Sequence, residues 1–138
     1  MSSAAQATNE TTLGEAEQRE FAQLDSNIKK LIPRLKNLKY KLDEGDLNVE
    51  AFGKNVLDLV RPFVNSTEEI SLEVREQIYH SITSLPDTLE EVEAEFSGIT
   101  DAYLGKRIDL KSAEARCKRV LNSLMRVIEG KAIYFEVE

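Results

Sequence analysis

Residues 21–42 read FAQLDSNIKKLIPRLKNLKYKL, and this stretch decides the fold. In a helix, apolar residues spaced by three and four positions share one narrow stripe, whereas a strand needs alternation by two. Such a stripe is typical of a helix that packs in a bundle or a coiled coil. At ~1.5 Å per residue, the stretch is roughly 33 Å long and spans a small domain. The apolar residues that recur in this way are Phe21, Leu24, Ile28, Leu31, Leu35, Leu38 and Leu42.

The flanking residues indicate where this first helix begins and ends. Thr12 followed by Glu15 fits a capping box at its start, and Gly45 is a plausible stop. Pro33 lacks a backbone donor and clashes with the preceding turn, so we expect one long helix kinked near Pro33. Two shorter helices that meet at this proline are the alternative.

A second helix is expected to start at Asn48, with Leu47 and Phe52 forming a hydrophobic staple around the cap. Pro62 should bend or end the last turn of this helix. The apolar face of the second helix consists of Val49, Phe52, Val56, Leu59, Val60 and Phe63.

A third helix and a fourth follow from the same signals. Ser66 and Glu69 fit a capping box for the third, which Pro86 interrupts. Asp87 with Glu90 is expected to start the fourth. The inward residues are Ile70, Val74, Ile78, Ile82 and Leu85 in the third helix, and Leu89, Val92, Phe96, Ile99 and Tyr103 in the fourth.

Gly105 should end the fourth helix, and Asp109 or Ser112 can cap a fifth that closes at Gly130. Because every connection is only a few residues long, neighbouring helices should be antiparallel. The sequence therefore predicts an all-α protein, an antiparallel bundle of four to five amphipathic helices. The inward face of the fifth helix consists of Ala113, Cys117, Val120, Leu121, Leu124 and Ile128.

The length of 138 residues fits one domain, expected over residues 12–130, with a disordered tail at 1–11 and a C-terminal tail at 131–138. The net charge of −7 argues against bulk attraction to nucleic acid or anionic membranes. One cysteine excludes an internal disulfide. No apolar run approaches a membrane span of ~20 residues, and no signal peptide is evident. We expect an intracellular, cytoplasmic protein, and a nuclear one is compatible with the same features.

Two charged blocks are the clearest candidate surfaces. Six acidic residues and no basic one lie between Asp87 and Asp101. A basic block without acids favours docking to an acidic protein, a phosphate backbone or a lipid surface. The alternative is two solvated helix faces that partly compensate each other across the bundle. The residues of the basic block are Lys29, Lys30, Arg34, Lys36, Lys39 and Lys41.

The C-terminal tail is a second candidate surface, because Ile133, Tyr134 and Phe135 are more apolar than a free terminus needs. The tail can dock on the bundle, join a partner or continue into a longer chain.

Residues with catalytic or metal-binding chemistry are sparse. His80 is the single histidine and cannot build a zinc site alone, and Cys117 falls on an apolar helix face. The loop 43–48 is acidic, but neither calcium-loop register supplies the required glycine and glutamate, so a helix-hairpin turn is expected. We expect no metal, no cofactor and no enzymatic activity.

These features predict a non-enzymatic protein–protein interaction module, an adaptor, scaffold or regulatory bundle. The alternative is a helical subunit of a nucleic-acid-handling assembly that contacts phosphates through the basic block, although nucleic acid is the less favoured partner. A homodimer is also possible, since the stripe of the first helix suits a dimer seam as well as an intramolecular core.

Overall fold

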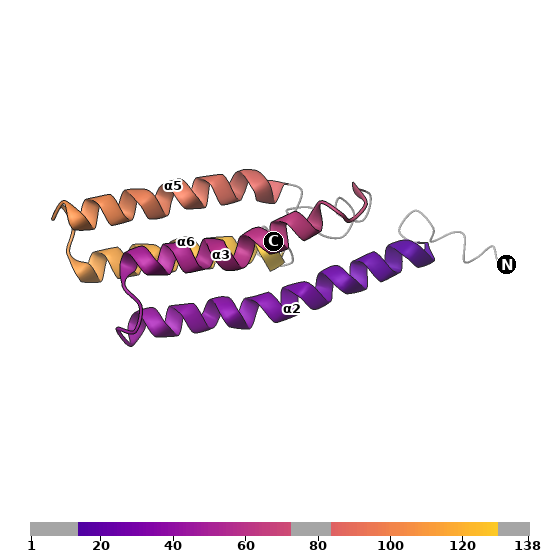
Figure 1. Cartoon of the computed structure of the whole chain (residues 1–138), viewed down its shortest axis with the longest axis horizontal. Helices are drawn as coiled ribbons and strands as arrows, with labels where there is room; N and C mark the ends of the chain where they lie inside the picture. The colour runs from indigo at the N-terminus through magenta and orange to yellow at the C-terminus, as the bar shows by residue number, and fades with distance from the viewer. Residues whose placement is uncertain (1–13, 73–83, 130–138) are drawn as a thin grey trace, which may run out of the picture.

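The computed structural model describes residues 14–72 and 84–129, and these residues form helices and no strand (Figure 1). The helices are α2 (Glu15–Asp43), α3 (Val49–Thr67), α5 (Leu85–Leu104) and α6 (Leu110–Glu129). Successive helices run in opposite directions along one long axis (Figure 1). The all-α antiparallel bundle is therefore confirmed.

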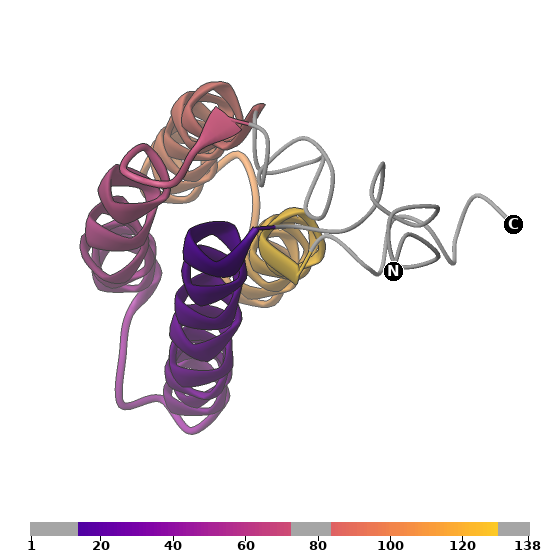
Figure 2. The same ribbon diagram turned by 90° about the vertical axis from the view of Figure 1, so that its right-hand side faces the viewer.

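The four helices of the described residues occupy the corners of the bundle, as the view along its axis shows (Figure 2). Helix α2 packs on α3 and α6, and α5 packs on the same two helices from the opposite side. Helices α2 and α5 are thus diagonal to each other. This arrangement decides which charged residues meet.

The predicted stripe of α2 lies inside the bundle. Leu24, Leu35 and Leu42 are fully buried, and Phe21 is partly buried against the same core. Helix α2 is a single helix through Pro33, and its ribbon curves along its length (Figure 1). Pro33 lies on the exposed side of α2, so its ring and the gap in the backbone hydrogen bonding face solvent rather than the core. The alternative of two shorter helices is wrong.

The second proline is tolerated in a similar way. Pro62 is exposed within α3, and the helix continues past it to Thr67. Of the two outcomes predicted for Pro62, an end to the helix is therefore wrong, and a bend stays a prediction. The predicted start of α3 is confirmed, because Asn48 Oδ1 accepts a hydrogen bond of 2.7 Å from the Ala51 N–H.

The capping box predicted at Ser66 does not exist. Ser66 lies in the last turn of α3, where its hydroxyl donates to the Phe63 carbonyl at 2.7 Å. Ser and Thr hydroxyls often bond to a carbonyl of the preceding turn, and Thr67 does the same to Val64. Most of the predicted third helix, with Val74, Ile78 and Ile82, lies outside the described residues.

Helix α5 begins three residues earlier than predicted, with its cap at Ser84 instead of Asp87. Leu85 is its first residue and is fully buried, and Ser84 precedes it as the cap residue. Pro86 sits in the first turn, where the missing backbone donor has no helical partner to lose. Asp87 is therefore a first-turn acid rather than the cap, and Leu85 belongs to this helix rather than to the one before it.

The start of α2 also differs from the prediction. Glu15 is the first helical residue, and the Glu17 carboxylate accepts a hydrogen bond of 2.8 Å from the Gly14 N–H. Half of a capping box is thus present, centred on Gly14. Thr12 lies outside the described residues, as do the N-terminal tail, His80, Gly130 and the C-terminal residues Ile133, Tyr134 and Phe135.

Helix α2 ends in a Schellman motif, in which the residue after the cap adopts a left-handed backbone. Gly45 has φ 82°, its N–H donates to the Leu42 carbonyl at 3.2 Å, and the Asp46 N–H donates to the Lys41 carbonyl at 2.9 Å. Glycine suits this position because it has no Cβ to clash.

Helix α5 ends in the same motif without a glycine at the left-handed position. Gly105 is the cap, with φ −81°, and the left-handed residue is Lys106, with φ 61°. The Lys106 N–H donates to Tyr103 at 3.0 Å and the Arg107 N–H to Ala102 at 2.8 Å. The helix stops at Gly105 as predicted, but a lysine carries the backbone strain.

Candidate partner-binding groove between α2 and α3

The basic block divides between two flanks of α2. At about 100° per residue, Lys30, Arg34 and Lys41 lie within about 40° of one another on the helix. The other three basic residues are centred about 150° away on the same helix. The block is therefore not one continuous face. Those three residues on the second flank are Lys29, Lys36 and Lys39.

The second flank includes two lysines that already have partners. Lys39 Nζ donates to Asn122 Oδ1 of α6 at 3.1 Å. Lys29 Nζ lies 3.0 Å from Asp25 Oδ2, one turn earlier on α2. These two side chains hold the bundle and the helix surface together, and they are less available to an outside partner than the first flank.

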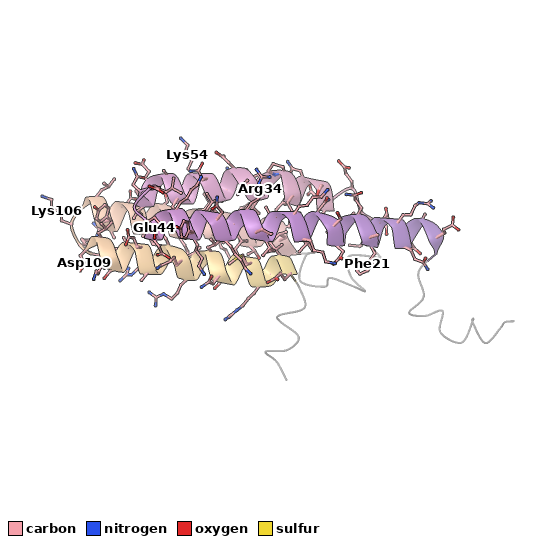
Figure 3. The ribbon with its side chains drawn as sticks, turned by 90° about the horizontal axis from the view of Figure 1, so that it is seen from below. Phe21, Arg34, Glu44, Lys54, Lys106 and Asp109 are labelled. Carbon is pink, nitrogen blue, oxygen red and sulfur yellow. The ribbon has the colours of Figure 1, made fainter. Side chains whose placement is uncertain are left out.

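The first flank lines a groove between α2 and α3. The groove consists of two adjoining hollows that share Arg34 and Leu59. Figure 3 shows Arg34 on the side of α2 that faces α3, whereas Lys54 of α3 points away from α2. The groove extends along α2 from Asn27 to Lys41, about 21 Å at 1.5 Å per residue.

The groove has an apolar floor and two rims that differ in charge. Leu31, Leu38 and Phe63 form buried parts of the floor, and Leu59 is half-buried in its centre. The α2 rim is basic. The α3 rim carries mainly uncharged polar side chains and a single acid: Asn55, Asp58 and Ser66.

The cations of the basic rim are not neutralised by the rest of the described chain. Lys30, Arg34 and Lys41 are exposed, and the structure shows no ion pair or side-chain hydrogen bond for any of them among the described residues. Positive charge that is unpaired along a groove attracts an acidic ligand.

The acidic block does not compensate this rim. It lies on α5, diagonal to α2, and no ion pair joins the two helices within the described residues. Its one described ion pair links Glu93 to Arg61 of α3, at 3.1 Å. The interpretation in which the two blocks compensate each other across the bundle is therefore not supported.

The acidic loop between α2 and α3 has a structural role. Asp43 Oδ1 accepts from Lys118 Nζ of α6 at 2.6 Å, and Asn48 caps α3. Gly45 closes the end of α2. The predicted helix-hairpin turn is confirmed. Over residues 14–72 and 84–129, no cluster of three or more His, Cys, Asp or Glu side chains is placed to hold a metal ion.

Cys117 lies in the core, as its position on the apolar face of α6 predicted. Burial and, to a smaller extent, the negative charge of Glu114 raise the pKa of its thiol to about 11. At neutral pH the side chain is thus a protonated thiol, which is a poor nucleophile.

Sequence reasoning found the cations but missed the groove. The separation of Lys30, Arg34 and Lys41 from the other lysines could have been read from helical angles alone. The α3 wall could not, because the sequence does not say which helix packs against which flank. Two exposed leucines at the turn between α5 and α6, Leu104 and Leu110, were also missed.

None of the described helices is long and apolar enough to cross a membrane. No family model, curated protein or solved structure matches the chain.

Proposed function

We propose that the protein is a non-enzymatic interaction module that binds an acidic segment of another protein in the α2–α3 groove. One observation carries this proposal: three unpaired cations, Lys30, Arg34 and Lys41, border a groove with an apolar floor. The combination suits an amphipathic segment with apolar side chains on one face and carboxylates beside them.

The two parts of the groove contribute differently to binding. Exposed ion pairs are worth only about 0–1 kcal/mol each, so the cations mainly select the partner and speed its association. Burial of apolar side chains over the floor supplies most of the affinity, at roughly 25 cal/mol per Å². The floor near Leu59 and the rim near Arg34 lie within the same two hollows, so one segment can use both.

The alternative partner is a phosphate backbone. A single-stranded nucleic acid binds best where aromatic side chains stack on its bases beside the cations. Tyr40 is the one aromatic residue within the basic block, and it lies about 120° around α2 from Arg34. The groove side of α2 therefore lacks a stacking platform, which favours an acidic protein over nucleic acid.

A charge-reversal variant tests the proposal. Lys30→Glu, Arg34→Glu and Lys41→Glu together should weaken capture of partner proteins by about tenfold or more, because like charges then face each other. The matched control is Lys29→Glu, Lys36→Glu and Lys54→Glu, which changes the net charge equally on exposed positions outside the groove.

One folding control and three binding measurements decide between the possible partners. Circular dichroism checks that both variants keep the helical content of the wild type. Quantitative affinity capture then compares the wild type with the two variants, and a partner that both variants retain contradicts the groove. Binding of a single-stranded oligonucleotide that weakens steeply with salt would favour the nucleic-acid alternative. Sedimentation velocity reports whether the bound partner is a second copy.

A further inference from the structure

The turn between α5 and α6 exposes apolar side chains beside cations. Leu104 is 64% exposed and Leu110 is 46% exposed, the first at the end of α5 and the second at the start of α6. Lys106, Arg107 and Lys111 are exposed on the same turn, and no ion pair is found for their side chains in the described part of the chain. These five residues are called the tip from here on.

The tip projects beyond the rest of the described bundle. In two views, the α5–α6 turn extends farther along the long axis than the α2–α3 turn (Figures 1 and 3). Lys106 lies at the outer end in Figure 3, and Glu44 of the other turn lies further back. The acidic residues of the α2–α3 turn therefore do not stand between the tip and a surface that meets it end-on.

The backbone of the tip is fixed from both sides. The hydrogen bonds of the Schellman motif hold Lys106 in its left-handed conformation. On the other side, Asp109 Oδ1 accepts a hydrogen bond of 2.8 Å from the Ser112 N–H and so caps α6. The leucines are exposed by the geometry of the turn. A shallow hollow beside them is lined by Tyr103, Leu104, Lys106, Arg107, Ile108 and Asp109.

We propose that the tip docks on the surface of an anionic lipid bilayer. Leu104 and Leu110 enter the boundary between headgroups and acyl chains, where exposed apolar side chains are stabilised. Lys106, Arg107 and Lys111 contact the anionic headgroups around them. A projecting convex turn reaches a flat and fluid surface without needing a complementary pocket, which favours a bilayer over a folded protein as the occupant.

Asp101 is the acid of α5 nearest to the tip: it precedes Leu104 by three residues, about 4.5 Å along the helix, and partly offsets the cations of the tip. The other acids of the block are more distant, since Glu95 precedes Leu104 by nine residues, about 14 Å along the helix. Repulsion between exposed charges is largely screened beyond about 8 Å at physiological ionic strength. Asp109 is the single carboxylate within the turn, and its charge is engaged by the α6 cap and by Lys111. Counted against Asp101 and Asp109, the three cations of the tip leave one net positive charge.

Vesicle co-sedimentation tests the proposal on the full chain. The probes are vesicles of phosphatidylcholine alone and vesicles of phosphatidylcholine with phosphatidylserine. The wild type should bind the anionic vesicles several-fold more than the neutral ones. Leu104→Ser with Leu110→Ser should lose most of that binding, and so should Lys106→Glu with Arg107→Glu. All four positions are exposed, so both variants should keep the circular dichroism spectrum of the wild type.

The Lys30→Glu, Arg34→Glu and Lys41→Glu variant is the control, because it reverses charges on α2 and leaves the residues of the tip unchanged. It should still bind anionic vesicles, whereas its partner capture fails if the groove is the protein site. Equal binding to both kinds of vesicle, no binding to either, or full binding by the Leu104→Ser, Leu110→Ser variant would overturn the proposal. Loss of a captured acidic protein from the tip variants, without vesicle binding, would reassign the tip to a protein partner.

Discussion

Alanine substitution at two helical glycines should change stability in opposite directions. Gly53 is buried in α3, where an added Cβ would lie 3.0 Å from both Cβ and Cγ of Phe96 in α5. Gly98 is exposed in α5, and an added Cβ there meets nothing within 4 Å. Both substitutions improve helix propensity by up to about 1 kcal/mol. The difference between them therefore reports on packing.

Gly53→Ala should destabilise the protein by up to about 2 kcal/mol. Overpacking a dense core costs typically 1–3 kcal/mol, from which the gain in helix propensity is subtracted. Phe96 cannot simply swing aside, because its Cβ is one of the contacted atoms and is fixed to the α5 backbone. Movement of Phe96 also disturbs its edge-to-face contact with Phe52, at 5.9 Å between ring centroids, and such a pair contributes about 0.5–1.5 kcal/mol.

Urea denaturation followed by circular dichroism measures both effects on the free energy of unfolding. Gly98→Ala should raise it by about 0.5–1 kcal/mol, and Gly53→Ala should lower it. A Gly53→Ala protein as stable as Gly98→Ala would refute the close α3–α5 packing. In a Phe96→Ala background, which removes the ring, Gly53→Ala should cost less, and a double-mutant cycle gives the coupling energy.

Three further outcomes test other parts of the structure. Gly45 and Lys106 both have positive φ, which glycine adopts more easily than other residues. In the same urea assay, Gly45→Ala should therefore destabilise the protein by about 1–2 kcal/mol, and Lys106→Gly should stabilise it by about 1 kcal/mol. Changes of the same sign at the two sites would contradict the two Schellman ends. The hydrogen bonds from Ser112, followed by the charge of Lys111, lower the pKa of Asp109 from 3.8. The ionised side chain therefore stabilises the folded state above that pH, and this stabilisation is lost as the pH falls through the lowered pKa. Urea titrations that compare the wild type with Asp109→Asn should show a stability difference that shrinks on acidification, and a difference that grows would reverse the assigned sign. The Cys117 thiol, with its pKa of about 11, should react with Ellman's reagent at pH 8 far more slowly in the native protein than in urea, and fast native labelling would show that it is accessible.

Local sequence patterns predicted much of the fold because they report on local physics. The spacing of Leu24, Leu35 and Leu42 already fixes which face of α2 is buried, whatever covers it. The cap at Asn48 needs only its own side chain and the Ala51 N–H. The errors lie where two local rules compete. Ser66 and Glu69 match a capping box, but Ser66 is still inside α3, whose apolar face continues through Val64.

The left-handed Lys106 shows another limit of local patterns. Glycine preference at helix ends drew the prediction to Gly105, one residue too early for the left-handed position. Which residue adopts φ 61° depends on how the chain must turn to start α6, and that requirement comes from packing rather than propensity.

The candidate groove depends on long-range order in the same way. Helical angles separate Lys30, Arg34 and Lys41 from the other lysines, but only the bundle shows that this flank borders α3 while Lys39 reaches Asn122 of α6. The diagonal position of α5 follows from the order of packing as well. It leaves six acids of α5 and three cations of α2 unable to neutralise each other within one molecule. Uncompensated charge adds little to folding stability, since exposed pairs contribute at most about 1 kcal/mol. Its main physical consequence is to steer charged partners toward the surfaces that carry it, and this is why the groove, rather than the core, is the place to look for function.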